Sequence, residues 1–190
     1  MSARRDELTR VAARLFAERG YQGTSLADLA AELGMQKPSL YHHIASKEDL
    51  LWEVAWEGAE AFHAALDGVP PGAAPERIRL ALRAHLAVVA GQLDIATVFV
   101  REWRYLEGER RDRFLAERRR YEERIRELFR DGVEGSQLRT DLDVPTAALL
   151  FLSAANWAYT WLRPGADTAQ LADRLYSALL DGMRGYATPG

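Results

Sequence analysis

The stretch that decides the fold is residues 24–43, which read TSLADLAAELGMQKPSLYHH. Its first half carries apolar residues at the three- and four-residue spacing of one helix face, namely Leu26, Leu29, Ala30 and Leu33. Ser25 stands three residues before Asp28, an arrangement that predicts a capping box at the start of this helix. Gly34 follows the last apolar position, where we expect the helix to stop.

A second short helix is predicted over residues 37–43, directly after a two-residue connection. Pro38 suits its first turn, where a missing N–H costs nothing. Two short helices joined by a tight turn with a glycine make a helix-turn-helix. The second helix of such a unit enters the DNA major groove, with its amino-terminal residues near base edges.

Outward from this stretch, helical periodicity continues along the chain and strand alternation is nearly absent. Apolar residues make up 48% and charged residues 28%, an ordinary globular mixture that argues against general disorder. The fold class we predict is all-α. About nine helices are expected: the two above, and others at 4–19, 47–66, 76–90, 93–106, 110–133, 144–162 and 168–186.

Charge and composition limit the function classes. Cysteine is absent, so disulfides and cysteine metal sites are excluded. Charged residues at positions 4–7 stand where a signal peptide would begin, and the longest apolar stretch, at 147–155, is too short to span a bilayer. We therefore expect a cytoplasmic protein without a membrane partner. Residues 1–47 carry two more basic than acidic residues and the remainder five more acidic than basic, as in a protein that touches phosphates with one end.

The amino-terminal third resembles the TetR family of bacterial regulators. The motifs that carry this resemblance are LFAERGY at 15–21, TSLADLA at 24–30, LG at 33–34 and SLYHHIASKEDLL at 39–51. The resemblance implies a DNA-binding domain at 1–47 and a ligand-binding and dimerisation domain at 48–190. It also implies a repressor that binds a palindromic double-stranded DNA operator as a dimer and leaves it when a small ligand binds.

The same resemblance assigns the residues that contact DNA. Those that would face base edges are Gln36, Lys37, Pro38 and Ser39. Those that would contact phosphates are Thr24, Ser25, Tyr41, His42 and Lys47. Gln36 stands where serine or threonine is common in the family, and a glutamine can pair with adenine through two hydrogen bonds.

Two aromatic segments, at 99–106 and 156–165, mark a candidate ligand site in the remainder of the chain. Trp157 and Trp161 lie four residues apart on one predicted helix face, and the adjacent Asn156 is costly to bury without hydrogen bonds. Aromatic rings with polar tips suit a mostly apolar pocket with a few orienting groups. The alternative is that each tryptophan anchors the core or a dimer interface.

These segments resemble the TetR subgroup that governs fatty-acid, phenylacetate or steroid-ring degradation and senses acyl-CoA thioesters. By that resemblance the acyl chain would lie among Phe99, Trp103, Tyr121 and Trp157. The CoA phosphates would meet Arg101, Arg104 or Arg163, because a guanidinium pairs well with phosphate. A hydrophobic ligand without CoA, such as a free acid, a steroid or a drug, is the alternative.

The last two predicted helices present small and large apolar residues at three- and four-residue spacing, as a homodimer interface requires. These are Leu149, Leu152 and Ala155, then Leu171, Leu175, Ala178, Leu179 and Met183. An enzyme is the rival class, but the sequence has no spaced nucleophile–base pair, helix-borne metal motif or glycine-rich phosphate loop. We therefore expect no catalysis, cofactor or metal. A third interpretation is a module that uses its helix-turn-helix for protein contact.

Overall fold

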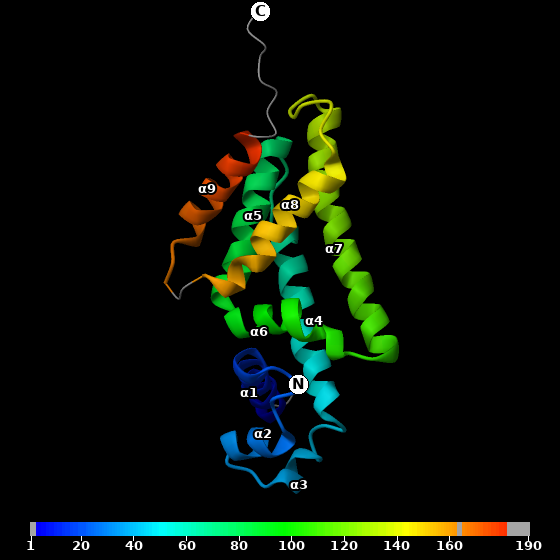
Figure 1. Ribbon diagram of the computed structural model, residues 1–190, viewed down its shortest axis with the longest axis vertical. Helices are drawn as coiled ribbons and strands as arrows, with labels where there is room; N and C mark the ends of the chain where they lie inside the picture. The colour runs from blue at the N-terminus through cyan, green and yellow to red at the C-terminus, as the bar shows by residue number, and fades with distance from the viewer. Residues whose placement is uncertain (1–2, 163–164, 182–190) are drawn as a thin grey trace, which may run out of the picture. The chain divides into compact units, whose positions relative to one another are not determined.

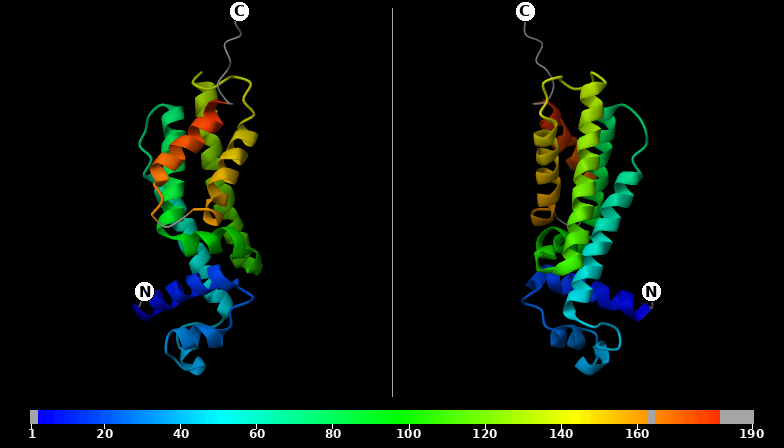
Figure 2. Two further views of the ribbon diagram at one scale, coloured as in Figure 1. Left: turned by 60° about the vertical axis from the view of Figure 1, so that its left-hand side comes forward. Right: turned by 90° about the vertical axis from the view of Figure 1, so that its right-hand side faces the viewer.

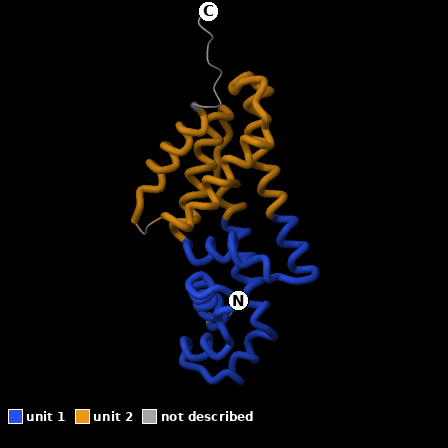
Figure 3. Tube along the Cα trace, viewed as in Figure 1, with its two compact units in different colours: residues 1–61, 92–117 blue, residues 62–91, 118–190 orange. Residues whose placement is uncertain are grey.

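The computed structural model describes residues 3–162 and 165–181, and within them it contains nine α-helices and no strand. The predicted all-helical class is therefore confirmed. By their internal contacts the residues form two compact units (Figure 3). Unit 1 comprises Met1–Ala61 and Gln92–Glu117, and unit 2 comprises Phe62–Gly91 and Arg118–Gly190. These units follow packing, so the functional division at residue 47 stays a prediction.

Unit 1 contains the predicted helix-turn-helix and the helices packed on it. Its elements are α1 (Ala3–Arg19), α2 (Leu26–Glu32), α3 (Lys37–Leu40), the first part of α4 (Lys47–Asp67), α6 (Leu93–Thr97), the π-helical turn η1 (Val98–Glu102), the 3₁₀ turn η2 (Trp103–Tyr105) and the start of α7 (Gly108–Glu134). Helix α1 lies between α2 and α6 and contacts both (Figures 1 and 2).

The core of unit 1 follows from the apolar stripe of α1. Leu8, Leu15 and Phe16 are almost completely buried, and each such side chain contributes about 1.5–3 kcal/mol relative to exposure. Gly20 ends the helix at φ +78°, and its N–H donates to the carbonyl of Phe16 over 3.0 Å. A glycine adopts this left-handed conformation without strain. Local sequence thus determines both the packed face of α1 and its last residue.

Unit 2 is a helical bundle. It contains α5 (Ala74–Gly91), α8 (Val144–Asn156), the 3₁₀ turn η3 (Trp157–Thr160), α9 (Thr168–Asp181) and the remaining parts of α4 and α7. Helices α5 and α9 run side by side (Figures 1 and 2), and Arg83 of α5 pairs there with Asp173 of α9. Phe129 and Phe151 meet edge to face in the core at a centroid distance of 6.3 Å.

The predicted helix at 93–106 is wrong as a continuous α-helix. It is α-helical only to Thr97, continues as the π turn η1 and closes as the 3₁₀ turn η2. The cause lies within unit 1. The side chain of Arg101 donates to the carbonyl of Ala17 in α1, and the side chain of Glu102 accepts from the N–H of Tyr21, just after α1. π turns inside helices are frequent at functional sites.

Two other helix ends also differ from expectation. The helix predicted at 37–43 is α-helical only to Leu40, and turns follow it. The helix predicted at 144–162 is α-helical only to Asn156 and tightens into η3. The last predicted helix is observed as far as Asp181, and its predicted end at Tyr186 lies outside the described residues.

In the described part of the chain, no single helix is long and apolar enough to cross a membrane. The segments Ala74–Gly91 and Leu93–Tyr105 reach that length and composition only when taken together as a bent pair.

Candidate functional site

The turn between α2 and α3 is built by local hydrogen bonds. Ser25 Oγ accepts from the N–H of Asp28 over 3.1 Å, while Asp28 Oδ2 accepts from the N–H of Ser25 over 2.7 Å, which confirms the capping box. Gly34 adopts φ +62°, and the next N–H, of Met35, donates to the carbonyl of Ala30 over 2.8 Å. The turn therefore starts α3 in one fixed direction relative to α2.

The amino-terminal end of α3 is the exposed part of this helix-turn-helix. Gln36, Lys37 and Pro38 are exposed and Ser39 is half-buried, whereas Leu40 is fully buried against the rest of unit 1. Gln36 precedes the first turn in extended conformation, and its side chain makes no capping hydrogen bond. The structure thus brings the four predicted base-facing residues together on one helix end.

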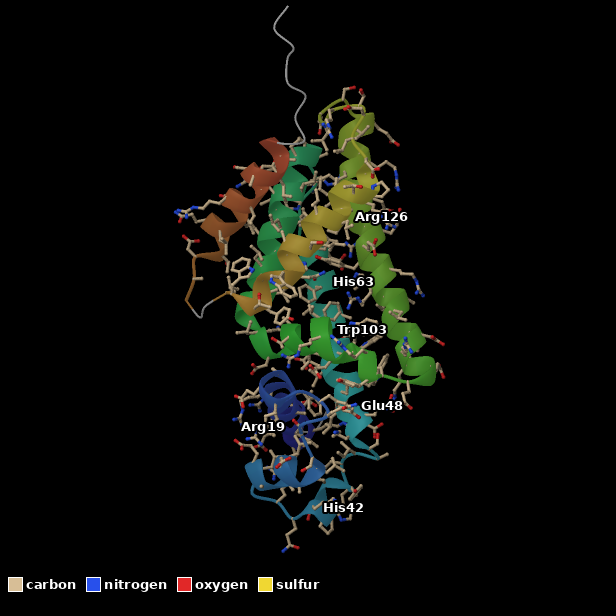
Figure 4. The ribbon with its side chains drawn as sticks, viewed as in Figure 1. Arg19, His42, Glu48, His63, Trp103 and Arg126 are labelled. Carbon is tan, nitrogen blue, oxygen red and sulfur yellow. The ribbon has the colours of Figure 1, made fainter. Side chains whose placement is uncertain are left out.

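Tyr41 and His42, two of the predicted phosphate contacts, follow α3 and are exposed (His42 is labelled in Figure 4). Tyr41 keeps 52% of its surface exposed, a large value for an aromatic side chain. Ser25 is also exposed, at the amino-terminal end of α2. A helix amino terminus attracts phosphate because its N–H groups and dipole point outward.

The side chains of Thr24 and Lys47 form hydrogen bonds to backbone carbonyls within unit 1. Thr24 is 1% exposed, and its hydroxyl donates to the carbonyls of Leu15 and Gly20. In the observed conformation this hydroxyl is bonded within unit 1, and the phosphate contact expected of Thr24 stays a prediction. Lys47 Nζ donates to the carbonyls of Tyr21 and Thr24, each over 2.8 Å, and lies 4.1 Å from the Tyr21 ring centroid. Partial burial lowers the pKa of Lys47, and one of its three N–H donors is left for a phosphate.

Arg101, predicted to meet CoA phosphates, binds the carboxyl-terminal end of α1. Its Nη2 donates to the carbonyl of Ala17 over 2.8 Å and to that of Phe16 over 3.3 Å. The last four carbonyls of a helix lack helical partners and carry partial negative charge, so a guanidinium is a suitable cap. Arg104 is exposed and donates to the carbonyl of Arg101 over 2.7 Å. In this structure Arg101 therefore connects η1 to the end of α1 within unit 1.

Glu102 adds a second connection between η1 and the residues after α1, and the sequence did not predict this role. Its carboxylate is 5% exposed, pairs with Arg101 and accepts from the backbone N–H of Tyr21 over 2.8 Å. A buried carboxylate is tolerated because both bonds are charge-assisted. The signal in the sequence is that Arg101 and Glu102 are adjacent within a run of apolar residues. Charged residues in such a run are expected to be buried and paired, not solvated.

The predicted acyl-binding residues fall into two groups, one in each unit. In unit 1, Phe99 and Trp103 both contact the ring of Phe114, at centroid distances of 5.3 and 6.0 Å (Trp103 is labelled in Figure 4). Phe99 is 7% exposed. In unit 2, Tyr121 is buried against Phe62, with a centroid distance of 6.1 Å.

Tyr121 forms a buried polar pair with His85. The sequence analysis predicted Tyr121 as a ligand residue but not His85. The Tyr121 hydroxyl lies 3.0 Å from His85 Nδ1, and the Phe62 ring covers the imidazole at a centroid distance of 4.5 Å. His85 is 1% exposed, so burial lowers its pKa to about 3 and keeps the ring neutral. Burial also raises the pKa of Tyr121. Within the described residues, His85 Nε2 has no hydrogen-bond partner.

The other predicted ligand residues lie around the end of α8. Asn156 is half-buried, but Trp157 and Trp161 are 62% and 41% exposed. The prediction that both indoles share one α-helix face is wrong, because η3 replaces the α-helix between them. Arg163 lies outside the described residues. No group of three or more histidine, aspartate or glutamate side chains that could hold a metal ion occurs in the residues the structure describes.

Two family models match the chain. Residues 8–54 match the model described as bacterial regulatory proteins, tetR family, and residues 71–183 match a tetracyclin repressor-like C-terminal domain. The HTH-type transcriptional repressor KstR2 of Mycobacterium tuberculosis is 30% identical over 187 residues, which cover 96% of this chain and 93% of that protein.

Solved structures share the fold over nearly the whole chain. The TetR family transcriptional regulator PfmR from Thermus thermophilus superposes with a TM-score of 0.86 at 32% identity, covering 95% of this chain and all of that one. AibR in complex with isovaleryl coenzyme A and operator DNA superposes with a TM-score of 0.83 at 29% identity, covering 93% of this chain and 98% of that one.

Proposed function

The chain belongs to the TetR family of bacterial regulatory proteins, and on this premise we propose that it represses transcription by binding an operator as a homodimer and leaves the DNA when an acyl-CoA thioester binds. The family and the matched relatives are transcription regulators, so the protein is not an enzyme. A regulator of this kind acts in the cytoplasm, where the bacterial chromosome lies.

The single observation that carries the DNA-binding role is the construction of α3. Its buried Leu40 fixes the helix to unit 1, while Gln36, Lys37 and Pro38 are exposed at its amino-terminal end. In our proposal these residues and Ser39 face base edges in the major groove, where Gln36 pairs with adenine. Ser25, Tyr41, His42 and the remaining donor of Lys47 contact phosphates, which set the orientation on the duplex.

The homodimer is supported by an apolar surface of unit 2. Leu149 and Leu150 of α8 are 62% and 49% exposed, and Trp157 and Trp161 follow them in the chain with large exposed fractions. Large exposed apolar side chains that lie this close together in the chain are typical of interfaces. The face expected from the sequence needs one change, because Ala155 is fully buried and points into the unit. Met183 lies outside the described residues.

The acyl-CoA effector is supported by the interior of unit 2 and by the relatives. AibR has been solved with isovaleryl coenzyme A and operator DNA. In unit 2 of this chain, the apolar core around Phe62 contains the His85–Tyr121 pair. If the Tyr121 hydroxyl donates to Nδ1, the opposite nitrogen of His85 carries a hydrogen without an acceptor. A thioester carbonyl entering this core would supply that acceptor.

A hydrophobic effector without CoA is the second candidate, and one observation favours it. Of the three arginines expected at the CoA phosphates, Arg101 is bonded to α1 carbonyls. A ligand that lacks phosphates, such as a free acid or a steroid, would not require these arginines.

A thermal-shift panel with purified protein separates the two candidates. The panel contains isovaleryl-CoA, longer acyl-CoAs, phenylacetyl-CoA, the matching free acids and CoA alone. A ligand at about 100 times its Kd adds about 2.7 kcal/mol to the unfolding free energy. We expect thioesters to raise the midpoint, and free acids and CoA alone to leave it unchanged. Shifts with the acids and not the thioesters would refute the CoA proposal and support the alternative.

A second assay tests the repressor itself. Operator duplexes are selected from a random library by the purified protein and labelled for fluorescence anisotropy. We expect a twofold-symmetric sequence, bound less tightly as salt rises, and released by the thioester that stabilises the protein. Unchanged operator affinity at saturating thioester would contradict the release mechanism, and failure to select any duplex would contradict DNA binding.

A further inference from the structure

Unit 1 contains a surface groove that the DNA-binding role does not use. It lies between α1 and α4 and has a volume of about 530 Å³. This volume is within the range of small-molecule sites, about 300–1,000 Å³. The α4 wall carries Trp52 and Trp56, and the two walls together carry four carboxylates, of Asp6, Glu53, Glu57 and Glu60, against one guanidinium, of Arg10.

Two of the four carboxylates already have partners. Glu53 pairs with Arg5 and accepts from the hydroxyl of Thr9 over 3.1 Å. Glu60 accepts from the indole Nε1 of Trp56 over 2.9 Å. These contacts hold the groove walls in place and orient one of its indole rings.

The other two carboxylates leave the groove negative. Asp6 and Glu57 form no ion pair within the described chain. Partial burial, and then the charges of Glu60 and Asp6, raise the pKa of Glu57. A positive charge placed among these groups would favour the ionised form of Glu57 and offset the repulsion between the carboxylates.

The tryptophan pair binds a cation in the structure itself. The rings of Trp52 and Trp56 lie 4.8 Å apart, centroid to centroid, and the guanidinium carbon of Arg113 lies 5.2 and 5.3 Å from the two centroids. Cations within about 6 Å of an indole face are attracted by its quadrupole. Both indoles also line the groove, whereas Arg113 does not, so the rings present apolar surface to a ligand there.

We propose that the α1–α4 groove is a second ligand site, which binds a small organic cation with an apolar body. The cationic centre lies among Asp6, Glu57 and Glu60, and the apolar body lies against Trp52 and Trp56. The site is confined to unit 1 and shares no residue with the proposed effector site. The proposal therefore does not depend on acyl-CoA sensing.

The test uses the whole protein and three defined probes. Benzyltrimethylammonium and choline are the cations, and 3,3-dimethyl-1-butanol is the neutral isostere of choline. Indole N–H signals of the five tryptophans are followed by ¹H–¹⁵N NMR and assigned with single Trp→Phe variants. We expect benzyltrimethylammonium to shift the signals of Trp52 and Trp56 saturably, choline to shift them with weaker affinity, and the neutral alcohol to leave them unchanged.

Charge removal provides the matched comparison. Glu57→Gln replaces an exposed groove carboxylate, and Glu109→Gln replaces an exposed carboxylate of α7 outside the groove. We expect the first to weaken cation binding by about tenfold, the scale of one charge-assisted contact, and the second to leave it unchanged. The proposal is overturned if neither cation moves these two signals at about 10 mM, ten times the Kd of a weak, millimolar complex. It is also overturned if the alcohol shifts them equally, or if both variants bind like the parent protein.

Discussion

Replacing His85 by leucine should change how the stability of the protein depends on pH. His85 is 1% exposed under the ring of Phe62, and burial lowers its pKa to about 3. In the unfolded chain the same imidazole titrates near pH 6.5, at about the ordinary value for histidine. Below that pH the unfolded state binds a proton that the native state does not bind. The native state therefore loses stability as the pH falls, and the full stability is present only above about pH 6.5.

The size of this effect follows from the two pKa values. Between the two values the unfolding free energy falls by about 1.4 kcal/mol for each pH unit. From pH 7 to pH 5 the His85 contribution therefore amounts to about 2 kcal/mol. For a chain of this size, that corresponds to a change of about 4–8 °C in Tm. Most carboxylates titrate below this window, at about pH 4, so they contribute little to it.

The assay is thermal unfolding followed by circular dichroism at pH 7, 6 and 5 and constant ionic strength. We expect the Tm of the parent protein to fall over this range by about 4–8 °C more than that of His85→Leu. Tyr121→Phe is the matched control, because it breaks the same hydrogen bond but keeps the buried imidazole, so it should retain the pH dependence. Parallel losses of Tm in the parent protein and His85→Leu would refute the assignment of a neutral, buried His85.

Three further substitutions test the site and the packing of unit 1. Gln36→Ala should reduce discrimination at one base pair of the operator by about 1–3 kcal/mol, measured by competition between single-base variants; an unchanged base preference would show that Gln36 reads no base. Glu102→Gln removes the charge that binds Arg101 and should lower the unfolding free energy by about 1–3 kcal/mol, measured by urea denaturation; a neutral result would place the carboxylate in water. Gly58→Ala should destabilise by about 1–3 kcal/mol, because the new Cβ would lie 2.9 Å from the Cβ of Phe99. Helix propensity alone predicts that Gly58→Ala raises the Tm, so a higher Tm would show that α4 and η1 do not pack closely.

The helix-turn-helix was predictable because its determinants are local. The capping box needs only Ser25 and Asp28, three residues apart, and the turn needs only a glycine at position 34 that accepts positive φ. The buried and exposed sides of α3 follow from the same short stretch, with Leu40 inside and Lys37 outside. None of these features depends on residues far away in the sequence, so the pattern and the structure agree.

The π turn at 98–102 was not predictable in the same way. Locally the residues from Leu93 to Leu106 continue a helical pattern. The departure is set by contacts with residues about 80 positions earlier in the chain, where Arg101 binds the carbonyl of Ala17 and Glu102 binds the N–H of Tyr21. Long-range contacts of this kind override local propensity and leave no periodic signal.

The aromatic residues at the end of α8 show how one wrong helix end changes a site prediction. Placing Trp157 and Trp161 on one face requires an α-helix between them, and η3 has fewer residues per turn. Both indoles are exposed. This exposure argues against a buried pocket formed by the two indoles, and their place in a dimer interface stays a proposal.

The effector residues predicted from the sequence differ in part from those that we propose from the structure, and the difference has a physical reason. A sequence shows which side chains can bind a ligand, but not which of them the fold already uses. Arg101 has the right chemistry for a phosphate, yet its donors are bonded to the end of α1. His85 carries no sequence signal, because a single histidine in an apolar stripe fits ordinary core packing. It is distinguished only by a nitrogen with no partner in the described structure, and an unsatisfied buried polar group costs about 1–3 kcal/mol. A ligand that supplies the missing acceptor recovers part of that cost on binding. The same imidazole should therefore lower the stability of the ligand-free protein and increase the affinity for the effector.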